Sequence, residues 1–166
     1  MRRILGVSAA AMLLASCGGD REGTIETEDG DLEYSIDESS GNAQFRLEDD
    51  EGQQISVNTG ANVAIDLPDG YTVYPGATVV SNSVINANDG AGSIVMLTTP
   101  DSPDKVAAFY RAQAEAAGIT IQMETTAQGS KMIAGESGDG KTFSLSANPG
   151  DEGTMAQLIV GSQLGE

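Results

Sequence analysis

Apolar and polar residues alternate in short runs between residues 24 and 60. The apolar positions of these runs are Ile25, Leu32, Tyr34, Ile36, Phe45, Leu47, Ile55 and Val57. Glycine-containing turn sequences at 28–30, 40–42, 51–52 and 59–60 separate the runs. A period of two between such turns predicts β-hairpins with one buried face. The alternative is a disordered segment, because the region is highly charged and has few large apolar residues.

The rest of the chain has the pattern of further strands and one amphipathic helix. Strands are expected at 71–74, 79–85, 93–99, 119–125, 130–135, 141–147 and 155–161. Ser102 suits an N-cap and Pro103 the first helical position, and Gly118 is expected to end the helix. The apolar stripe between them consists of Val106, Phe109, Tyr110, Ala114 and Ala117.

These elements predict the α+β fold class. We expect an acidic N-terminal β-hairpin segment, followed by an antiparallel sheet with one packed amphipathic helix at about 102–117. The expected division of the chain is a signal peptide at 1–16, a lipidated tether at 17–23, an acidic β-rich segment at 24–66 and an α+β domain at 67–166.

The amino terminus has the pattern of an export signal. Arg2 and Arg3 precede an apolar stretch, Ile4 to Ala15, which is too short to span a membrane. It ends in Leu14-Ala15-Ser16-Cys17, which resembles the lipobox of bacterial lipoproteins. The alternative is an ordinary secretory signal with a chance cysteine.

The resemblance to lipoproteins implies cleavage between Ser16 and Cys17 and attachment of acyl chains, such as palmitate, to Cys17. Two or three acyl chains anchor a protein stably to a membrane. Gly18 lies where Asp would retain a lipoprotein at the inner membrane, so the resemblance implies an outer-membrane anchor facing the periplasm. The expected partner of Cys17 is therefore the membrane.

A second resemblance concerns residues 67–161. Tyr74-Pro75-Gly76-Ala77, Thr98-Thr99 before Asp101-Ser102-Pro103, and the pair Phe109-Tyr110 occur in the order found in small α+β domains of bacterial lipoproteins of uncharacterised function. This resemblance implies a fold and a location, and it brings no catalytic residues.

Composition excludes several classes of function. The chain has 25 acidic and 8 basic residues, no histidine and one cysteine, and its net charge is −17. This charge argues against nucleic-acid binding, and the lack of histidine removes the commonest general base and metal ligand. The acids are concentrated near the anchor, because residues 20–66 contain 14 of the 25.

Two motifs resemble catalytic or nucleotide-binding sites. Residues 135–142 fit the phosphate-loop pattern, but the alternation after Lys141 predicts a strand where that motif needs a helix, so we interpret 137–140 as a hairpin turn. Ser102 and Lys105 have the spacing of penicillin-binding enzymes, but the partner motifs of those enzymes are missing.

The acidic segment raises the question of calcium. A calcium loop starting at Asp29 would place Asp31 and Glu33 correctly but has Tyr34 where glycine is needed, and the cluster at 48–51 has no loop geometry. Tyr71, Tyr74 and Tyr110 are candidates for a ligand groove, but the aromatic residues Phe45, Phe109, Tyr110 and Phe143 are more typical of a core.

We therefore expect a non-enzymatic, membrane-anchored structural or interaction module, with no catalytic residues, no metal site, no cofactor and no nucleotide. The alternative function is a binding module for divalent cations or a cationic partner, which the acidic segment would attract. A hydrolase that uses carboxylates or Ser102 is the third hypothesis.

Overall fold

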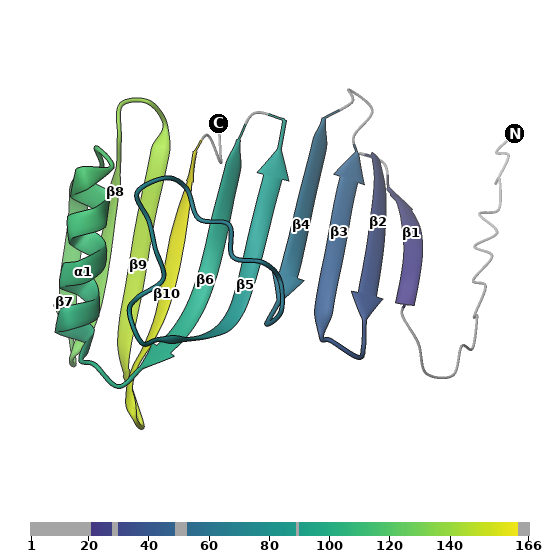
Figure 1. Ribbon diagram of the computed structural model, residues 1–166. Coiled ribbons are helices and arrows are strands. Elements are labelled where there is room, and N and C mark those ends of the chain that lie inside the picture. Colours follow the sequence, from purple (N-terminus) through teal and green to yellow (C-terminus); the bar gives the residue numbers. More distant parts are fainter. Residues whose placement is uncertain (1–20, 28–29, 49–52, 89, 163–166) are drawn as a thin grey trace, which may run out of the picture.

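The ten strands of the described residues form one antiparallel sheet, and a single helix packs on part of one face (Figure 1). The computed structural model describes residues 21–27, 30–48, 53–88 and 90–162. The elements are β1 (Arg21–Thr27), β2 (Gly30–Asp37), β3 (Asn42–Glu48), β4 (Gln54–Gly60), β5 (Thr78–Ala87), β6 (Ala91–Thr99), α1 (Pro103–Ala116), β7 (Thr120–Ala127), β8 (Ser130–Glu136), β9 (Lys141–Gly150) and β10 (Gly153–Ser162). Their order in the sheet is β1-β2-β3-β4-β5-β6-β10-β9-β8-β7.

The predicted α+β fold class is wrong, because 61% of the described residues are in strands and 10% are helical. The acidic strands do not form a hairpin segment that precedes a separate sheet. Instead β4 pairs with β5, with Val57 opposite Ile85. The backbone groups along the two strand edges hydrogen-bond to each other. The acidic side chains that suggested a separate unit point to the faces of the sheet. They therefore do not oppose the backbone hydrogen bonds between the edges of β4 and β5.

Most of the predicted elements are confirmed in position. The expected strand at 71–74 is wrong, since these residues lie in the loop 61–77 between β4 and β5. The N–H of Tyr71 donates to the carbonyl of Pro68, and the N–H of Tyr74 donates to the hydroxyl of Tyr110 at 3.0 Å. The backbone of this segment therefore bonds to a turn and a side chain rather than to a strand.

Helix α1 begins and ends where the sequence predicts. The carbonyl of Ser102 accepts the N–H groups of Lys105 and Val106, although the Ser102 side chain makes no capping bond. At the other end, Gly118 has a φ of 87°, and the N–H of Ile119 donates to the carbonyl of Ala114 at 2.9 Å. This 6→1 bond is the Schellman motif that glycine favours.

The core lies between α1 and the strands on which it packs, β7 to β10. Val95, Leu158, Leu145 and Ile133 form one cross-strand row from β6 to β8, and each is at most 1% exposed. The helix covers the core with fully buried side chains, above all that of Tyr110. The hydrophobic stabilisation of the fold is therefore concentrated in this half of the sheet.

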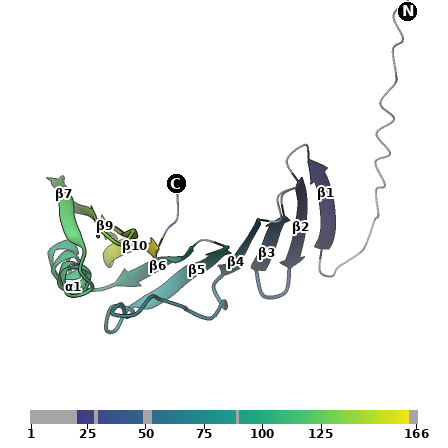
Figure 2. The same ribbon diagram turned by 90° about the horizontal axis from the view of Figure 1, so that it is seen from above.

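The loop 61–77 lies on the same side of the sheet as α1 (Figure 2). The amide of Asn82 donates to the carbonyl of Ala64 at 2.9 Å, and Ser93 donates its hydroxyl proton to the carbonyl of Asp66. Gln113 of α1 donates to the Thr72 hydroxyl at 2.8 Å. Helix and loop together cover β5 to β10, whereas β1 to β4 extend beyond them.

No helix among the described residues is long and apolar enough to cross a membrane.

Candidate functional site

Strands β1 to β4 form a single layer with two chemically different faces. Cross-strand pairing aligns Thr24, Glu33, Arg46, Ser56 and Asn86 in one row. A second row on the same side consists of Glu26, Asp31, Glu48 and Gln54. We call this side, which continues into the helix-covered side of β5 to β10, the polar face. It is built by the strand period, because every second residue points to the same side.

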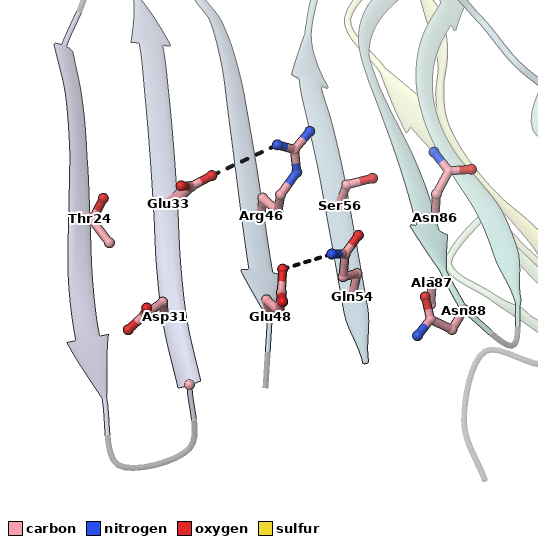
Figure 3. A pocket seen from close by; sticks show the side chains of 11 residues that line it. Thr24, Asp31, Glu33, Arg46, Glu48, Gln54, Ser56, Asn86, Ala87 and Asn88 are labelled. Atoms are coloured by element: carbon pink, nitrogen blue, oxygen red, sulfur yellow. Dashed lines mark hydrogen bonds and ion pairs between the residues drawn. The ribbon is translucent and has the colours of Figure 1, made fainter. Parts of the chain in front are cut away.

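The polar face is hollowed into a groove of ≈ 770 Å³ between β1 and the end of β5 (Figure 3). Its lining residues are Thr24, Gly30, Asp31, Glu33, Arg46, Glu48, Gln54, Ser56, Asn86, Ala87 and Asn88. Most of them present carboxylate, amide or hydroxyl groups. The groove therefore offers mainly hydrogen-bond acceptors, with the guanidinium of Arg46 as the one basic group of its lining.

Two side-chain contacts organise the groove. Arg46 Nη1 lies 3.8 Å from Glu33 Oε2, and Gln54 Nε2 donates to Glu48 Oε2 at 2.7 Å (Figure 3). Arg46 and Glu33 are 52% and 61% exposed, so this ion pair contributes little to stability. Since three carboxylates face a single guanidinium, the groove has a net negative charge and favours cationic ligands.

The described residues of the groove include neither a metal-binding cluster nor a hydroxyl beside an imidazole or amine. Among the described residues no group of three or more acidic, cysteine or histidine side chains is arranged to hold a metal ion. The hydroxyls of Thr24 and Ser56 lie on the same row as Arg46 and Glu33, and this row contains no imidazole or amine that would activate them.

The opposite side of β1 to β5 is apolar. Its larger side chains are Ile25, Leu32, Tyr34, Ile36, Phe45, Leu47, Ile55, Val57 and Ile85, and we call this side the apolar face. Pairing brings Leu32 opposite Leu47 and Tyr34 opposite Phe45. The predicted one-sided alternation is confirmed, but no described element covers this face, and the expected core residue Phe45 is 36% exposed.

Tyr34 and Gly23 meet on the apolar face because they are cross-strand partners. A Cβ on Gly23 would lie 2.6 Å from the Tyr34 hydroxyl oxygen. The ring therefore lies over the glycine at the outer strand, an arrangement that shields the backbone of a strand glycine.

The hairpin between β2 and β3 is held by the carboxylate of Asp37. Oδ1 accepts the N–H and the hydroxyl of Ser39 at 2.8 and 2.6 Å, and Oδ2 accepts the hydroxyl of Ser40 at 2.6 Å. These hydrogen bonds, above all the two from the hydroxyls of Ser39 and Ser40, hold the pKa of Asp37 well below its usual range. The turn fixes the register that aligns the two faces.

Several residues singled out from the sequence lie outside the described residues. They include the lipidation residue Cys17, its neighbour Ser16, Asp29 of the calcium loop and residues 49–51 of the acidic cluster. Asp31, Glu33 and Glu48 are described, and all three line the groove.

The phosphate-loop pattern at 135–142 and the Ser102–Lys105 pair lie in a turn and at a helix start, where they form structural contacts. Residues 137–140 form a hairpin turn, in which the N–H of Ser137 donates to the carbonyl of Lys141 at 2.9 Å, so the predicted hairpin is confirmed. Lys141 pairs with Asp139 at 2.7 Å. Lys105 pairs with Asp101 at 2.7 Å, and this contact raises the pKa of Lys105, the opposite of what a neutral base requires.

The three candidate groove tyrosines belong to the core region. Tyr110 is fully buried and Tyr74 is 8% exposed, while the Tyr71 ring stacks on Phe143 with centroids 6.1 Å apart. Burial raises the pKa of Tyr71 and of Tyr110 to about 12. The interpretation of Phe109, Tyr110 and Phe143 as core or core-packed residues is confirmed.

Sequence reasoning missed Arg46, Gln54, Ser56 and Asn86 as members of one site. The sequence signal for these residues is that they occupy the polar positions, which alternate with the apolar positions of the same strands. Aligning them also requires the cross-strand register, which local patterns do not supply.

Comparison with known proteins gives one match. A family model described as START domain-like matches residues 79–154, from within β5 to the start of β10. Neither the curated proteins nor the solved structures contain a match to this chain. The region of similarity includes α1 and β6 to β9 but only the first two residues of β10, and it excludes β1 to β4. In this helix-covered half, the chain is similar to the START domain-like family.

Proposed function

We propose that this protein is an exported lipoprotein, anchored through acyl chains on Cys17 to the outer membrane on its periplasmic side, and that it acts as a non-enzymatic interaction module. The observation that carries the module is the layer β1 to β4, which extends past α1 and has no helix packed on either face among the described residues. The similarity of the other half to the START domain-like family hints at ligand binding and is consistent with this role.

The anchor is tested by metabolic labelling of the full-length protein in a bacterial host with radiolabelled palmitate. We expect label in the native chain and none in the Cys17→Ala variant, because the resemblance assigns the thioether to this sulfur. Ser16→Ala is the matched control, since a small residue at this place retains the cleavage site. Labelling that survives Cys17→Ala would contradict the anchor.

A second candidate function is the capture of a cationic partner by the polar face. It is favoured by the four carboxylates of Glu26, Asp31, Glu33 and Glu48 on β1 to β3 and by the single guanidinium of Arg46 among them. Such a partner would carry several Lys or Arg side chains, because the carboxylates lie on neighbouring strands about 4.8 Å apart.

A lysine-rich peptide is the probe for this second function. Glu33→Gln together with Glu48→Gln is expected to weaken binding about threefold to tenfold, since each exposed ion pair contributes at most about 1 kcal/mol. Calorimetry on the full chain measures the change. The control is Asp151→Asn with Glu152→Gln in the exposed β9–β10 turn, which removes the same charge elsewhere. Equal weakening by both pairs would show attraction by net charge alone and would refute a site on the polar face.

A further inference from the structure

The apolar face of β1 to β5 consists of side chains that normally form a core. Ile25 is 50% exposed and Ile55 42% exposed. Helix α1 and the loop 61–77 both lie on the other side of the sheet (Figure 2). Extended apolar patches on soluble domains mark sites of interaction, and a sheet usually needs a layer packed against its apolar face.

We propose that a second copy of this chain packs its apolar face against this one, so that two sheets form a sandwich across a twofold axis. The contact is isologous, because the same patch serves both partners. Sheets pack face to face at about 10 Å, and the cross-strand rows of branched and aromatic side chains are suited to interdigitate at that spacing.

The distribution of charge favours this contact. The acids of the described strands β1 to β3 all point to the polar face, and they are Glu22, Glu26, Asp31, Glu33, Asp37 and Glu48. Arg21, which pairs with Glu38 at 2.7 Å, is the charged residue on the apolar side of these strands. Two copies therefore meet without bringing the carboxylates of these described strands together, and those carboxylates remain on the outside of the sandwich.

A lipid bilayer is the other apolar surface available to an anchored protein. Surfaces that lie on bacterial or anionic bilayers use several Lys or Arg side chains. The apolar face provides Arg21 at one margin, and the chain as a whole has a net charge of −17. The charge pattern thus favours a second copy over the bilayer.

The size of the patch corresponds to a small interface. Ile25, Phe45 and Ile55 are exposed and the other six side chains are half-buried, so complete coverage of the nine buries on the order of 500 Å² per copy. The total of roughly 1,000 Å² reaches the threshold for a specific interface, before flanking residues are added.

Cysteine cross-linking in intact membranes tests the contact on the full chain. Phe45 lies on β3, the middle strand of the apolar face, and its neighbour Gln44 points to the polar face. We expect Phe45→Cys to give a dimer with a bis-maleimide that spans on the order of 10 Å, the distance between stacked sheets. Gln44→Cys is expected to give none, and any reaction of Cys17 is common to both variants.

A second pair of variants tests the same contact without relying on one site. Leu47→Glu, introduced beside Phe45→Cys, is expected to reduce the cross-linked dimer at least about tenfold, because it places a charge within the packed layer. Gln44→Glu adds the same charge to the polar face and is expected to leave the dimer unchanged. Ile55→Cys with Gln54→Cys as its control repeats the measurement on β4, should Phe45→Cys fold poorly.

Two results would overturn the proposal. Equal cross-linking of Phe45→Cys and Gln44→Cys would indicate chance collision in the membrane. Absence of dimer at both Phe45→Cys and Ile55→Cys, with both thiols protected from maleimide by phospholipid vesicles, would assign the face to the bilayer. Neither result depends on whether the polar face binds a partner.

Discussion

Replacing Gly153 with alanine is expected to destabilise the protein by about 3 kcal/mol or more. Gly153 has a φ of 133°, a conformation that L side chains rarely adopt. A Cβ at this position would also lie 2.6 Å from Pro100 Cα and would overlap the carbonyl oxygen of Thr99. Both obstacles are backbone atoms at the start of the connection to α1, so they move only if the strands separate.

A graded series of glycine variants separates the effect of the positive φ from the effect of the overlap with backbone atoms. Gly118→Ala meets a φ of 87° but no atom within 4 Å, and we expect it to cost about 1 kcal/mol. Gly138→Ala meets no atom within 4 Å and has no positive φ, so its effect is expected to be near zero. Urea denaturation monitored by circular dichroism gives the free energies of unfolding. A Gly153→Ala protein as stable as Gly118→Ala would contradict the predicted overlap.

Truncating Tyr110 to alanine is expected to cost about 3–5 kcal/mol. Tyr110 is fully buried between α1 and the sheet, and its ring meets Phe109 edge-on with centroids 5.1 Å apart. Its hydroxyl accepts the backbone N–H of Tyr74 at 3.0 Å. The variant therefore loses packing and leaves a buried backbone donor without its acceptor, and thermal unfolding provides the measurement.

One further variant separates the packing of the Tyr110 ring from its hydrogen bond, and another serves as a control. Tyr110→Phe retains the ring and is expected to cost about 1–3 kcal/mol through the unpaired N–H of Tyr74. Ala112→Gln changes an exposed position of the same helix to another good helix former and is expected to have almost no effect. If Tyr110→Phe is as stable as the native chain, the bond to Tyr74 contributes nothing measurable, and the loop 61–77 is held by other contacts.

Local patterns predicted the elements well because strands and helix ends have local causes. The helix at 103–116 follows from Pro103, the apolar stripe and Gly118, which all act within a few residues. The hairpin at 137–140 follows from the period of two after Lys141. In each case the hydrogen bonds that define the element join residues that are close in the sequence.

The errors concern contacts between distant residues. Alternation in the acidic strands predicts an apolar face, and that is found, but alternation does not say what covers it, so Phe45 was wrongly assigned to a core. The joining of β4 to β5 depends on two edges separated by the loop 61–77. The groove requires the register of five strands, of which the local pattern indicates only the facing of each residue.

The strand order also has a consequence for distance from a membrane. If Cys17 carries the acyl chains, β1 begins four residues after the anchor. In the order of the sheet, each following strand lies one strand spacing farther from β1. Nine steps of about 4.8 Å place β7 roughly 43 Å from β1 along the sheet. The single sheet then acts as a spacer of fixed length. The polar and apolar faces of β1 to β4 would then be the part of the sheet nearest the anchor, and the helix-covered half would be the part most distant from it.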